Sequence, residues 1–174
     1  LMNKEQARIL GLTGRKNIPD KERKRRSHEI FLKLLPYLKR AKKIGCYVSL
    51  YEEVSTDEIL VWCFENQKEV YVPKVKGRTL RFYEIHSFDD LKEGSFHVKE
   101  PVTDREIPVR QLDMMIVPVV AFDEEGNRCG FGKGYYDSVL NDSQLKTGIA
   151  YKEQKVEHID FEEHDVKLDE IIVG

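Results

Sequence analysis

The chain has 174 residues, of which 40% are hydrophobic and 34% are charged, and this balance predicts one folded domain over residues 2–174. Its 29 basic and 31 acidic residues leave a net charge of −2, which excludes a protein that coats nucleic acid by bulk charge. No run of about 18 apolar residues occurs, so we expect no membrane span. Leu1 precedes a methionine, and we expect Met2 to be the natural start.

The three cysteines indicate a reducing compartment. They are Cys46, Cys63 and Cys129, an odd number at wide spacings and without a C-x-x-C pair, so neither a disulfide framework nor a zinc finger is expected. Residues 1–16 lack the apolar core of a signal peptide. We therefore expect a cytoplasmic protein, and we expect it to act as a monomer.

The first third of the chain predicts two helices. A short helix is expected over residues 2–12, where Lys4 and Arg8, four residues apart, project from one face. Asn17 and Pro19 supply the start signals for a second helix that reaches about residue 40. We expect Pro36 to kink this helix or to end it early, because proline removes a backbone donor.

Strands and helices then alternate. Ser55 and Glu58 have the spacing of a capping box at the start of a third helix. Strands are expected over residues 44–50, 70–75, 80–85, 114–122, 147–150 and 171–173. Further helical turns are expected over residues 87–91 and 134–140, and residues 93–111 are expected to form a long irregular connection.

This alternation predicts the fold class. It favours a single three-layer α/β/α domain with a mostly parallel, Rossmann-like sheet, because buried parallel strands read as short apolar runs. Ligands of such sheets bind beyond the carboxyl ends of the strands.

A basic segment lies near the N-terminus. Between Arg15 and Lys43 there are 12 basic residues against 3 acidic ones. Its densest part, residues 21–26, is typical of a nucleic-acid patch, of a solvated helix face, or of a surface that attracts an anionic small molecule. We favour the solvated helix face.

A glycine-rich loop at residues 126–137 is the sharpest signal. Gly130, Gly132 and Gly134 alternate between an apolar strand and a helix start, a pattern that lets backbone N–H groups surround an anion. Arg128 and Lys133 supply cations for phosphate oxygens. The spacing matches neither a Walker A loop nor the dinucleotide pattern G-x-G-x-x-G, so a phosphate site and a purely structural turn both stay open here.

The same loop carries a family resemblance. The run Gly-Asn-Arg-Cys-Gly-Phe-Gly-Lys-Gly-Tyr-Tyr-Asp, residues 126–137, resembles the nucleotide loop of the 5-formyltetrahydrofolate cyclo-ligase family. Further similarity runs from residue 4 to residue 169. It is carried by Lys4 and Arg8, by Val48-Ser-Leu-Tyr-Glu-Glu53, by residues 55–59, 72–74, 113–118 and 122–123, and by Tyr151-Lys-Glu-Gln154 and residues 165–169.

The resemblance implies an ATP- and Mg²⁺-dependent enzyme. Such an enzyme cyclises 5-formyltetrahydrofolate to 5,10-methenyltetrahydrofolate and releases ADP and phosphate, after the γ-phosphoryl group has moved to the formyl oxygen. The protein then mainly positions its substrates and neutralises phosphoryl charge.

The resemblance also implies roles for individual residues. Lys133 and Arg128 would be catalytic, and Asp137 and Asp165 would hold the metal. The residues implied in ATP binding are Lys4, Arg8, Arg128, Gly130, Phe131, Gly132, Lys133, Gly134, Tyr135 and Tyr136. Those implied in folate binding are Val48, Glu53, Phe131, Gly132, Lys133, Gly134 and Tyr135.

One position departs from the family pattern, and two other functions stay open. Some members carry arginine where this chain has Phe131, which either leaves Lys133 and Arg128 with more phosphate charge or offers a stacking surface for the pterin. A nucleotide-binding regulatory module without catalysis would bind ATP but show no folate turnover. A nucleic-acid binder using residues 21–43 would bind with a steep dependence on salt.

Overall fold

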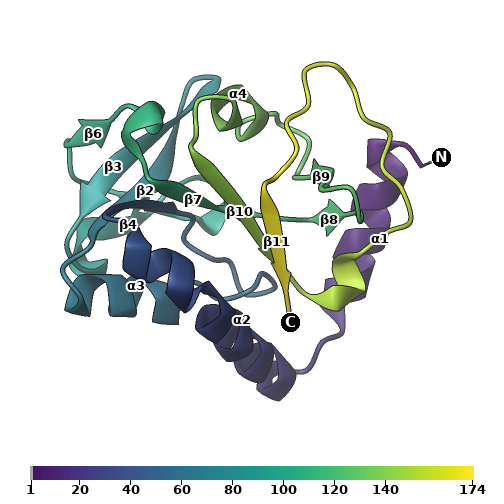
Figure 1. Ribbon diagram of the computed structural model, residues 1–174, viewed down its shortest axis with the longest axis horizontal. Coiled ribbons are helices and arrows are strands. Elements are labelled where there is room, and N and C mark those ends of the chain that lie inside the picture. Colours follow the sequence, from purple (N-terminus) through teal and green to yellow (C-terminus); the bar gives the residue numbers. More distant parts are fainter. Residues whose placement is uncertain (1) are drawn as a thin grey trace.

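The computed structural model describes residues 2–174, and most of its strands belong to one sheet. That sheet contains β1 (Lys43–Cys46), β2 (Glu69–Lys76), β3 (Thr79–Ile85), β6 (Glu106–Ile107), β7 (Met114–Pro118), β10 (Leu145–Ala150) and β11 (Glu170–Val173). The strand order is β11-β10-β7-β1-β2-β3-β6 (Figure 1). The five strands from β11 to β2 run parallel, whereas β3 is antiparallel to both of its neighbours. The expected α/β fold with a mostly parallel sheet is therefore confirmed.

The remaining elements are helices, turns and small hairpins. The helices are α1 (Lys4–Lys16), α2 (Asp20–Arg40), α3 (Asp57–Glu65) and α4 (Asp137–Leu140). Short 3-10 turns are η1 (Phe88–Asp90), η2 (Ser95–His97), η3 (Val109–Gln111) and η4 (Lys152–Gln154). Two hairpins pair β4 (Leu91–Glu93) with β5 (Lys99–Pro101), and β8 (Ala121–Phe122) with β9 (Arg128–Cys129).

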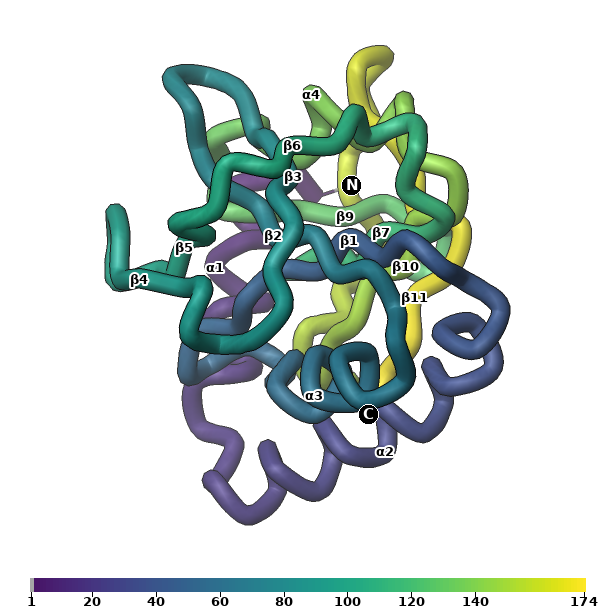
Figure 2. Tube along the Cα trace, turned by 90° about the vertical axis from the view of Figure 1, so that its left-hand side faces the viewer, coloured from purple at the N-terminus to yellow at the C-terminus, as the bar shows by residue number. Residues whose placement is uncertain are grey.

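The two faces of the sheet are covered differently. Helices α2 and α3 lie on one face (Figures 1 and 2). There they bury Leu34 and Ile59 in one cluster with Ile44 and Met114. On the other face, the short α4 contributes Leu140, and loops complete the cover. The cover on this second face is therefore thin, and the glycine loop lies on the same face.

Helix α1 packs against the chain beyond the carboxyl end of β7, beside β8 and β9 (Figure 1). Glycines make this contact possible, since a Cβ at Gly11 would overlap the carbonyl of Val120 and one at Gly14 would overlap that of Glu153. Glycine inside a helix costs about 1 kcal/mol relative to alanine. Here that cost accompanies a close approach that brings the face of α1 to the glycine loop.

Helix α2 reaches Arg40 as expected, and Pro36 does not end it early, because the proline is on an exposed face where the carbonyl left without a donor can be hydrated. The expectation about the start of α3 was wrong. The capping box of Ser55 and Glu58 does not form. Thr56 is the N-cap residue of α3, and its hydroxyl instead donates to the Tyr47 carbonyl at 2.9 Å.

The apolar run 114–122 and the helix after the glycine loop also differ from expectation. The strand ends at Pro118. Beyond it, Nε2 of Gln154 donates hydrogen bonds to the carbonyls of Val119 and Val120, at 2.7 and 3.0 Å. These carbonyls are thereby lost to the sheet, and the chain leaves it. Helix α4 begins at Asp137 rather than at Gly134, because Gly132 and Gly134 have positive φ angles of 91° and 72° that a helix does not contain.

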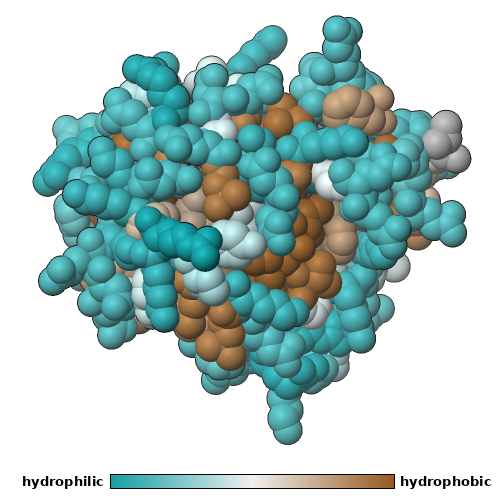
Figure 3. All heavy atoms as spheres, in the orientation of Figure 1, coloured by the Kyte–Doolittle hydropathy of each residue, from teal (hydrophilic) through white to brown (hydrophobic). Residues whose placement is uncertain are grey.

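The surface is mostly hydrophilic on the face shown in Figure 3, with hydrophobic side chains gathered around the edge strand β11. Residues 93–111, expected to be irregular, hold only short strands and turns. No helix within residues 2–174 is long and apolar enough to cross a membrane.

Candidate active site

The base of the glycine loop lies against the carboxyl end of β7, as the fold class predicts. Arg128 reaches back from β9 and donates from Nε and Nη2 to the carbonyl of Pro118, at 3.2 and 3.0 Å. Its side chain is only 4% exposed, and its Nη1 lies 3.8 Å from Asp137. Burial lowers the pKa of Arg128, and the nearby carboxylate of Asp137 opposes that shift. The guanidinium is thus a fixed cation at the base of the loop.

The loop itself depends on its glycines. Gly132 and Gly134 have positive φ, where a Cβ is disfavoured. Residues 131–134 are exposed, and the side chain of Lys133 makes no hydrogen bond or ion pair with residues 2–174. The loop therefore combines a fixed cation at its base with a free cation at its tip.

The predicted basic pair on α1 meets this loop. Arg8 donates from Nε to the Gly130 carbonyl at 2.8 Å, and its guanidinium packs against the Cα of Gly132. Lys4 lies one turn earlier on the same face and bonds Asp165 at 2.6 Å. Helix α1 and the glycine loop, more than 120 residues apart in sequence, are thus in direct contact, and Arg8 lies beside the loop.

The two predicted metal ligands each face a basic side chain. Asp137 lies 3.8 Å from Nη1 of Arg128, and Asp165 pairs with Lys4 at 2.6 Å. Asp165 also accepts the Glu162 amide at 2.8 Å, which fixes its orientation beside Lys4. No cluster of three or more His, Cys, Asp or Glu side chains suited to a metal occurs within residues 2–174. Two hard oxygen ligands nevertheless fit Mg²⁺, which takes its other ligands from waters and phosphate oxygens.

The predicted folate contacts lie after the carboxyl end of β1. Val48 is buried, and Glu53 is 8% exposed, with its Oε1 accepting the Leu50 amide at 2.7 Å. Burial raises the pKa of Glu53, while the hydrogen bond from Leu50 and the positive charge of Arg15 oppose the shift. A carboxylate held this way can accept hydrogen bonds from a ligand that carries N–H donors.

The tyrosine pair lies at the base of the glycine loop. Tyr135 packs against the core of the loop-covered face, and the ring of Tyr136 lies 5.6 Å from the Arg128 guanidinium carbon. Burial raises the pKa of Tyr136, and the negative charge of Glu53 adds to that shift. Tyr136 is therefore packed beside the fixed cation at the base of the glycine loop.

Two arginines in this region were not recognised from the sequence. Arg15 lies on the same face of α1 as Lys4 and Arg8, at spacings of eleven and seven residues, so helical periodicity alone could have indicated it. Arg23 of α2 is buried and donates to main-chain carbonyls, including those of Ile18 at 2.9 Å and Glu52 at 2.7 Å. No local sequence signal distinguishes Arg23 from the exposed basic residues around it.

Most of the basic run 21–26 is engaged within the protein. Arg25 pairs with Glu22 and Glu29, and Arg26 pairs with Glu153 at 2.6 Å. Internal pairs of this kind leave little of the run free for an external polyanion, which supports the interpretation as a helix face.

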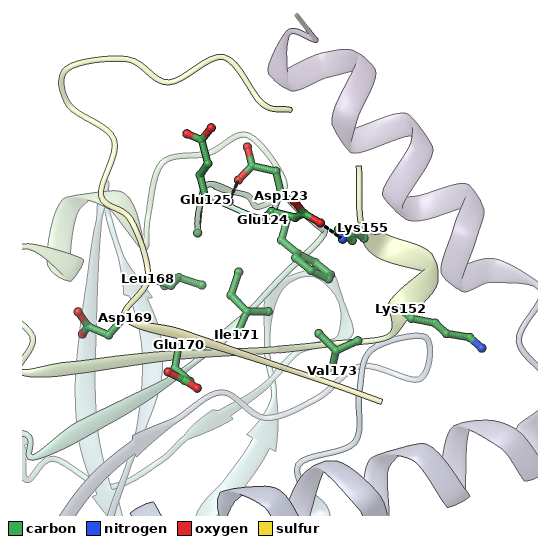
Figure 4. Close-up of a pocket in the computed structure, with 12 residues that line it drawn as sticks. Asp123, Glu124, Glu125, Lys152, Lys155, Leu168, Asp169, Glu170, Ile171 and Val173 are labelled. Atoms are coloured by element: carbon green, nitrogen blue, oxygen red, sulfur yellow. Dashed lines mark hydrogen bonds and ion pairs between the residues drawn. The ribbon is translucent and has the colours of Figure 1, made fainter. Parts of the chain in front are cut away.

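A shallow depression of about 510 Å³ lies elsewhere, at the turn after β8 and the edge strand β11 (Figure 4). Its carboxylates serve local structure. Asp123 accepts hydrogen bonds from the backbone of Asn127 and Ile159, and Glu124 pairs with Lys155 at 2.7 Å. It is therefore not the candidate site.

The fold and the loop together define an α/β protein with a glycine loop and basic side chains beside the carboxyl ends of its strands. A family model described as the 5-formyltetrahydrofolate cyclo-ligase family matches residues 2–174. The 5-formyltetrahydrofolate cyclo-ligase of Haemophilus influenzae is 35% identical over 145 residues, covering 78% of each chain. The NMR structure of Aquifex aeolicus 5,10-methenyltetrahydrofolate synthetase has a TM-score of 0.87 and 35% identity, covering 98% of this chain and 89% of that one.

A second solved structure, a 5,10-methenyltetrahydrofolate synthetase from Mycoplasma pneumoniae, has a TM-score of 0.80 and 28% identity, covering 98% of both chains. The chain belongs to the 5-formyltetrahydrofolate cyclo-ligase family, and it is therefore an enzyme of the ligase class. The resemblance noted from the glycine loop is thereby confirmed.

Proposed function

We propose that this enzyme converts 5-formyltetrahydrofolate to 5,10-methenyltetrahydrofolate and consumes ATP to ADP and phosphate. The observation that carries the proposal is the glycine loop clasped between Arg8 and Arg128 at the carboxyl end of β7. Membership of the family supplies the substrate class. Residues 2–174 act as one functional domain in this proposal.

ATP binds where α1 meets the loop. Backbone N–H groups of residues 130–136 face the phosphates, with Lys4, Arg8 and Arg128 supplying positive charge. In the free protein, Lys4 and Arg128 face Asp165 and Asp137, so the site already pairs cations with carboxylates. Asp137 and Asp165 would hold Mg²⁺, which supplies additional neutralisation of phosphate charge when bound.

The chemistry has two steps, and each balances. The formyl oxygen attacks the γ-phosphorus of ATP, forming an O–P bond as the bond to the bridging oxygen breaks, and ADP leaves with that electron pair. The neighbouring folate nitrogen then attacks the activated carbon and loses its proton. Phosphate leaves with the former formyl oxygen.

The protein's own contribution is to position the reactants and to stabilise charge. Lys133 at the loop tip is free to follow the transferring phosphoryl group, whereas Arg128 holds the base of the loop in place. Folate lies against Val48, Glu53, Tyr135 and the residues of the loop tip from Phe131 to Gly134. The γ-phosphate and the formyl oxygen then meet at the loop tip.

The proposal also covers the compartment and the oligomeric state. We place the protein in the cytoplasm as a monomer, and its three buried, unpaired cysteines are compatible with a reducing compartment.

The test is turnover of 5-formyltetrahydrofolate with ATP and Mg²⁺, followed by the near-ultraviolet absorbance of the methenyl product. We expect an ATP-dependent rise that Asp137→Ala abolishes, while Asp142→Ala, an exposed position just beyond the same helix, leaves it intact. Folded protein that binds ATP but gives no rise would contradict the proposal and favour a regulatory nucleotide-binding module.

A further inference from the structure

An unpaired buried guanidinium lies at the folate side of the site. Arg15, in the last turn of α1, is 3% exposed, and its Nε and Nη1 atoms are buried without a hydrogen-bond partner among residues 2–174. Leaving such a cation unpaired is costly, because burial removes its hydration. A buried group of this kind is retained most readily where a ligand completes its hydrogen bonds.

The surroundings of Arg15 point into the site rather than into the core. Its guanidinium carbon lies 5.5 Å from the centroid of the Phe131 ring, at the exposed tip of the glycine loop. Its positive charge also opposes the rise in the pKa of Glu53, the buried carboxylate that follows β1. The Nε and Nη1 atoms of Arg15 do not bond this carboxylate, whose Oε1 accepts the Leu50 amide instead.

Arg23 holds this arrangement in place. Its guanidinium donates to the carbonyls of Ile18 and Arg15 at the end of α1, and to that of Glu52 in the loop that carries Glu53. One buried side chain thus ties together the two segments that present Arg15 and Glu53. The separation between the cation and the carboxylate is preorganised before any ligand binds.

The chemistry of the pair selects one kind of ligand edge. Arg15 offers only donors, and the ionised Glu53 offers only acceptors. A phosphate presents acceptors alone, so the adjacent carboxylate would repel it. The 2-amino-4-oxopyrimidine edge of a pterin carries a carbonyl acceptor beside N–H and NH₂ donors, and this mixed edge matches both side chains at once.

We propose that Arg15 and Glu53 form a two-sided recognition site for the pterin edge of folate, in which Arg15 donates to the ring carbonyl and Glu53 accepts from the N–H and amino groups. This inference rests on the proposed function and deepens it, because it assigns substrate recognition to a residue outside the glycine loop. Phe131 covers the guanidinium on the side of the loop tip. Arg15 is a recognition residue in this scheme and takes no part in phosphoryl transfer.

The experiment compares Arg15→Met with Lys16→Met, an exposed neighbour that removes the same charge from the same helix turn. Binding is measured by calorimetry without turnover, using 5-formyltetrahydrofolate, ATP, and the tail-free probe 5-formyl-6-methyltetrahydropterin. We expect Arg15→Met to weaken the folate and the tail-free probe by the same factor, on the order of tenfold to a hundredfold, the usual worth of a hydrogen bond to a charged group. ATP affinity stays unchanged, and Lys16→Met alters none of the three.

Stability separates recognition from a structural role. Because Arg15→Met removes an unpartnered buried charge, we expect its melting temperature to equal or exceed that of the wild type. Glu53→Gln is expected to weaken the same two ligands, and the double variant to lose less than the product of the two single losses, because both contacts serve one ring. Arg15→Lys, which keeps the charge, should recover part of the affinity and provides the test if Arg15→Met does not fold.

Other outcomes overturn the inference. Loss of ATP affinity would make Arg15 a nucleotide contact, and loss confined to the full folate would assign it to the tail carboxylates. Unchanged binding of all three ligands by folded Arg15→Met would contradict the inference alone. A wild type that binds no folate would contradict the proposed function together with it.

Discussion

The base and the tip of the glycine loop are built on opposite principles. At the base, Arg128 is buried and held by the Pro118 carbonyl, so its position is part of the fold. At the tip, Lys133 is exposed and bonded to no other described residue, and Phe131 is 52% exposed. A fixed cation stabilises charge without reorganising, whereas a mobile one follows charge that moves. Substitutions at the tip should therefore change turnover alone, whereas substitutions at the base should change both turnover and stability.

Removing the cation at the tip should have the largest effect on rate and almost none on stability. We expect Lys133→Ala to lower turnover by about 10²–10³-fold, as for the loss of one transition-state donor. Its free energy of unfolding should stay within about 0.5 kcal/mol of the wild type, since the side chain is exposed and unbonded. Steady-state turnover and urea unfolding measure the two quantities.

Lys99→Ala provides the matched control for this prediction, because Lys99 is also exposed and lies on β5, outside the site. It should change neither quantity. A Lys133→Ala variant with normal turnover would remove the distinction between base and tip.

Changing the cation at the base should affect both properties. Arg128→Lys keeps the charge but loses the paired donation to the Pro118 carbonyl. We expect the free energy of unfolding to fall by about 1–3 kcal/mol, the range for hydrogen bonds that involve a charged group. Turnover should fall as well, because the loop loses its anchor. Urea unfolding at constant pH is the decisive measurement, and an unchanged midpoint would show that Arg128 is not an anchor.

The two regions also differ in how far the sequence predicts them. The loop was visible because its signals are local: alternating glycines, a preceding apolar strand and basic residues within five positions. The anchor was not, because the bond from Arg128 to Pro118 depends on a hairpin that folds β9 back on β8. Arg15 was missed for a related reason. Its burial follows from the close packing of α1 on Val120, which only the tertiary structure determines.

The same distinction applies to the fold. Apolar runs predicted the strands of the sheet, because burial on both faces leaves a local trace in the sequence. The capping box at Ser55 failed because Glu58 pairs with His28 at 2.8 Å, and the Ser55 N–H donates to Ser27 Oγ at 3.0 Å instead. Propensity describes what a side chain can do nearby, and a tertiary partner can take that side chain away.

Glu53 extends the comparison to pH. Burial raises its pKa above the ordinary value of 4.5, so between pH 4.5 and the raised pKa the folded protein binds more protons than the unfolded chain. Stability should therefore fall as the pH rises through that window. We expect Glu53→Gln to abolish this fall, because glutamine does not titrate. Urea unfolding of both proteins from pH 4 to pH 8 gives the two slopes, and parallel slopes would contradict the assignment to Glu53.

The smallest expected effect is the loss of stability when alanine replaces a glycine with positive φ. Two such glycines, one in the loop and one outside it, distinguish backbone strain from a role in turnover. Gly134 in the loop and Gly77 in the turn between β2 and β3 have φ angles of 72° and 61°, with no atom within 4 Å of an added Cβ. Alanine at either position meets only the cost of left-handed backbone, about 1 kcal/mol. We expect Gly134→Ala and Gly77→Ala to lose equal stability in urea unfolding. Only Gly134→Ala should also lose turnover, because its strain shifts the N–H groups that face the phosphates. Equal turnover in both variants would mean that the loop tolerates displacement, and the tip would then act through Lys133 alone.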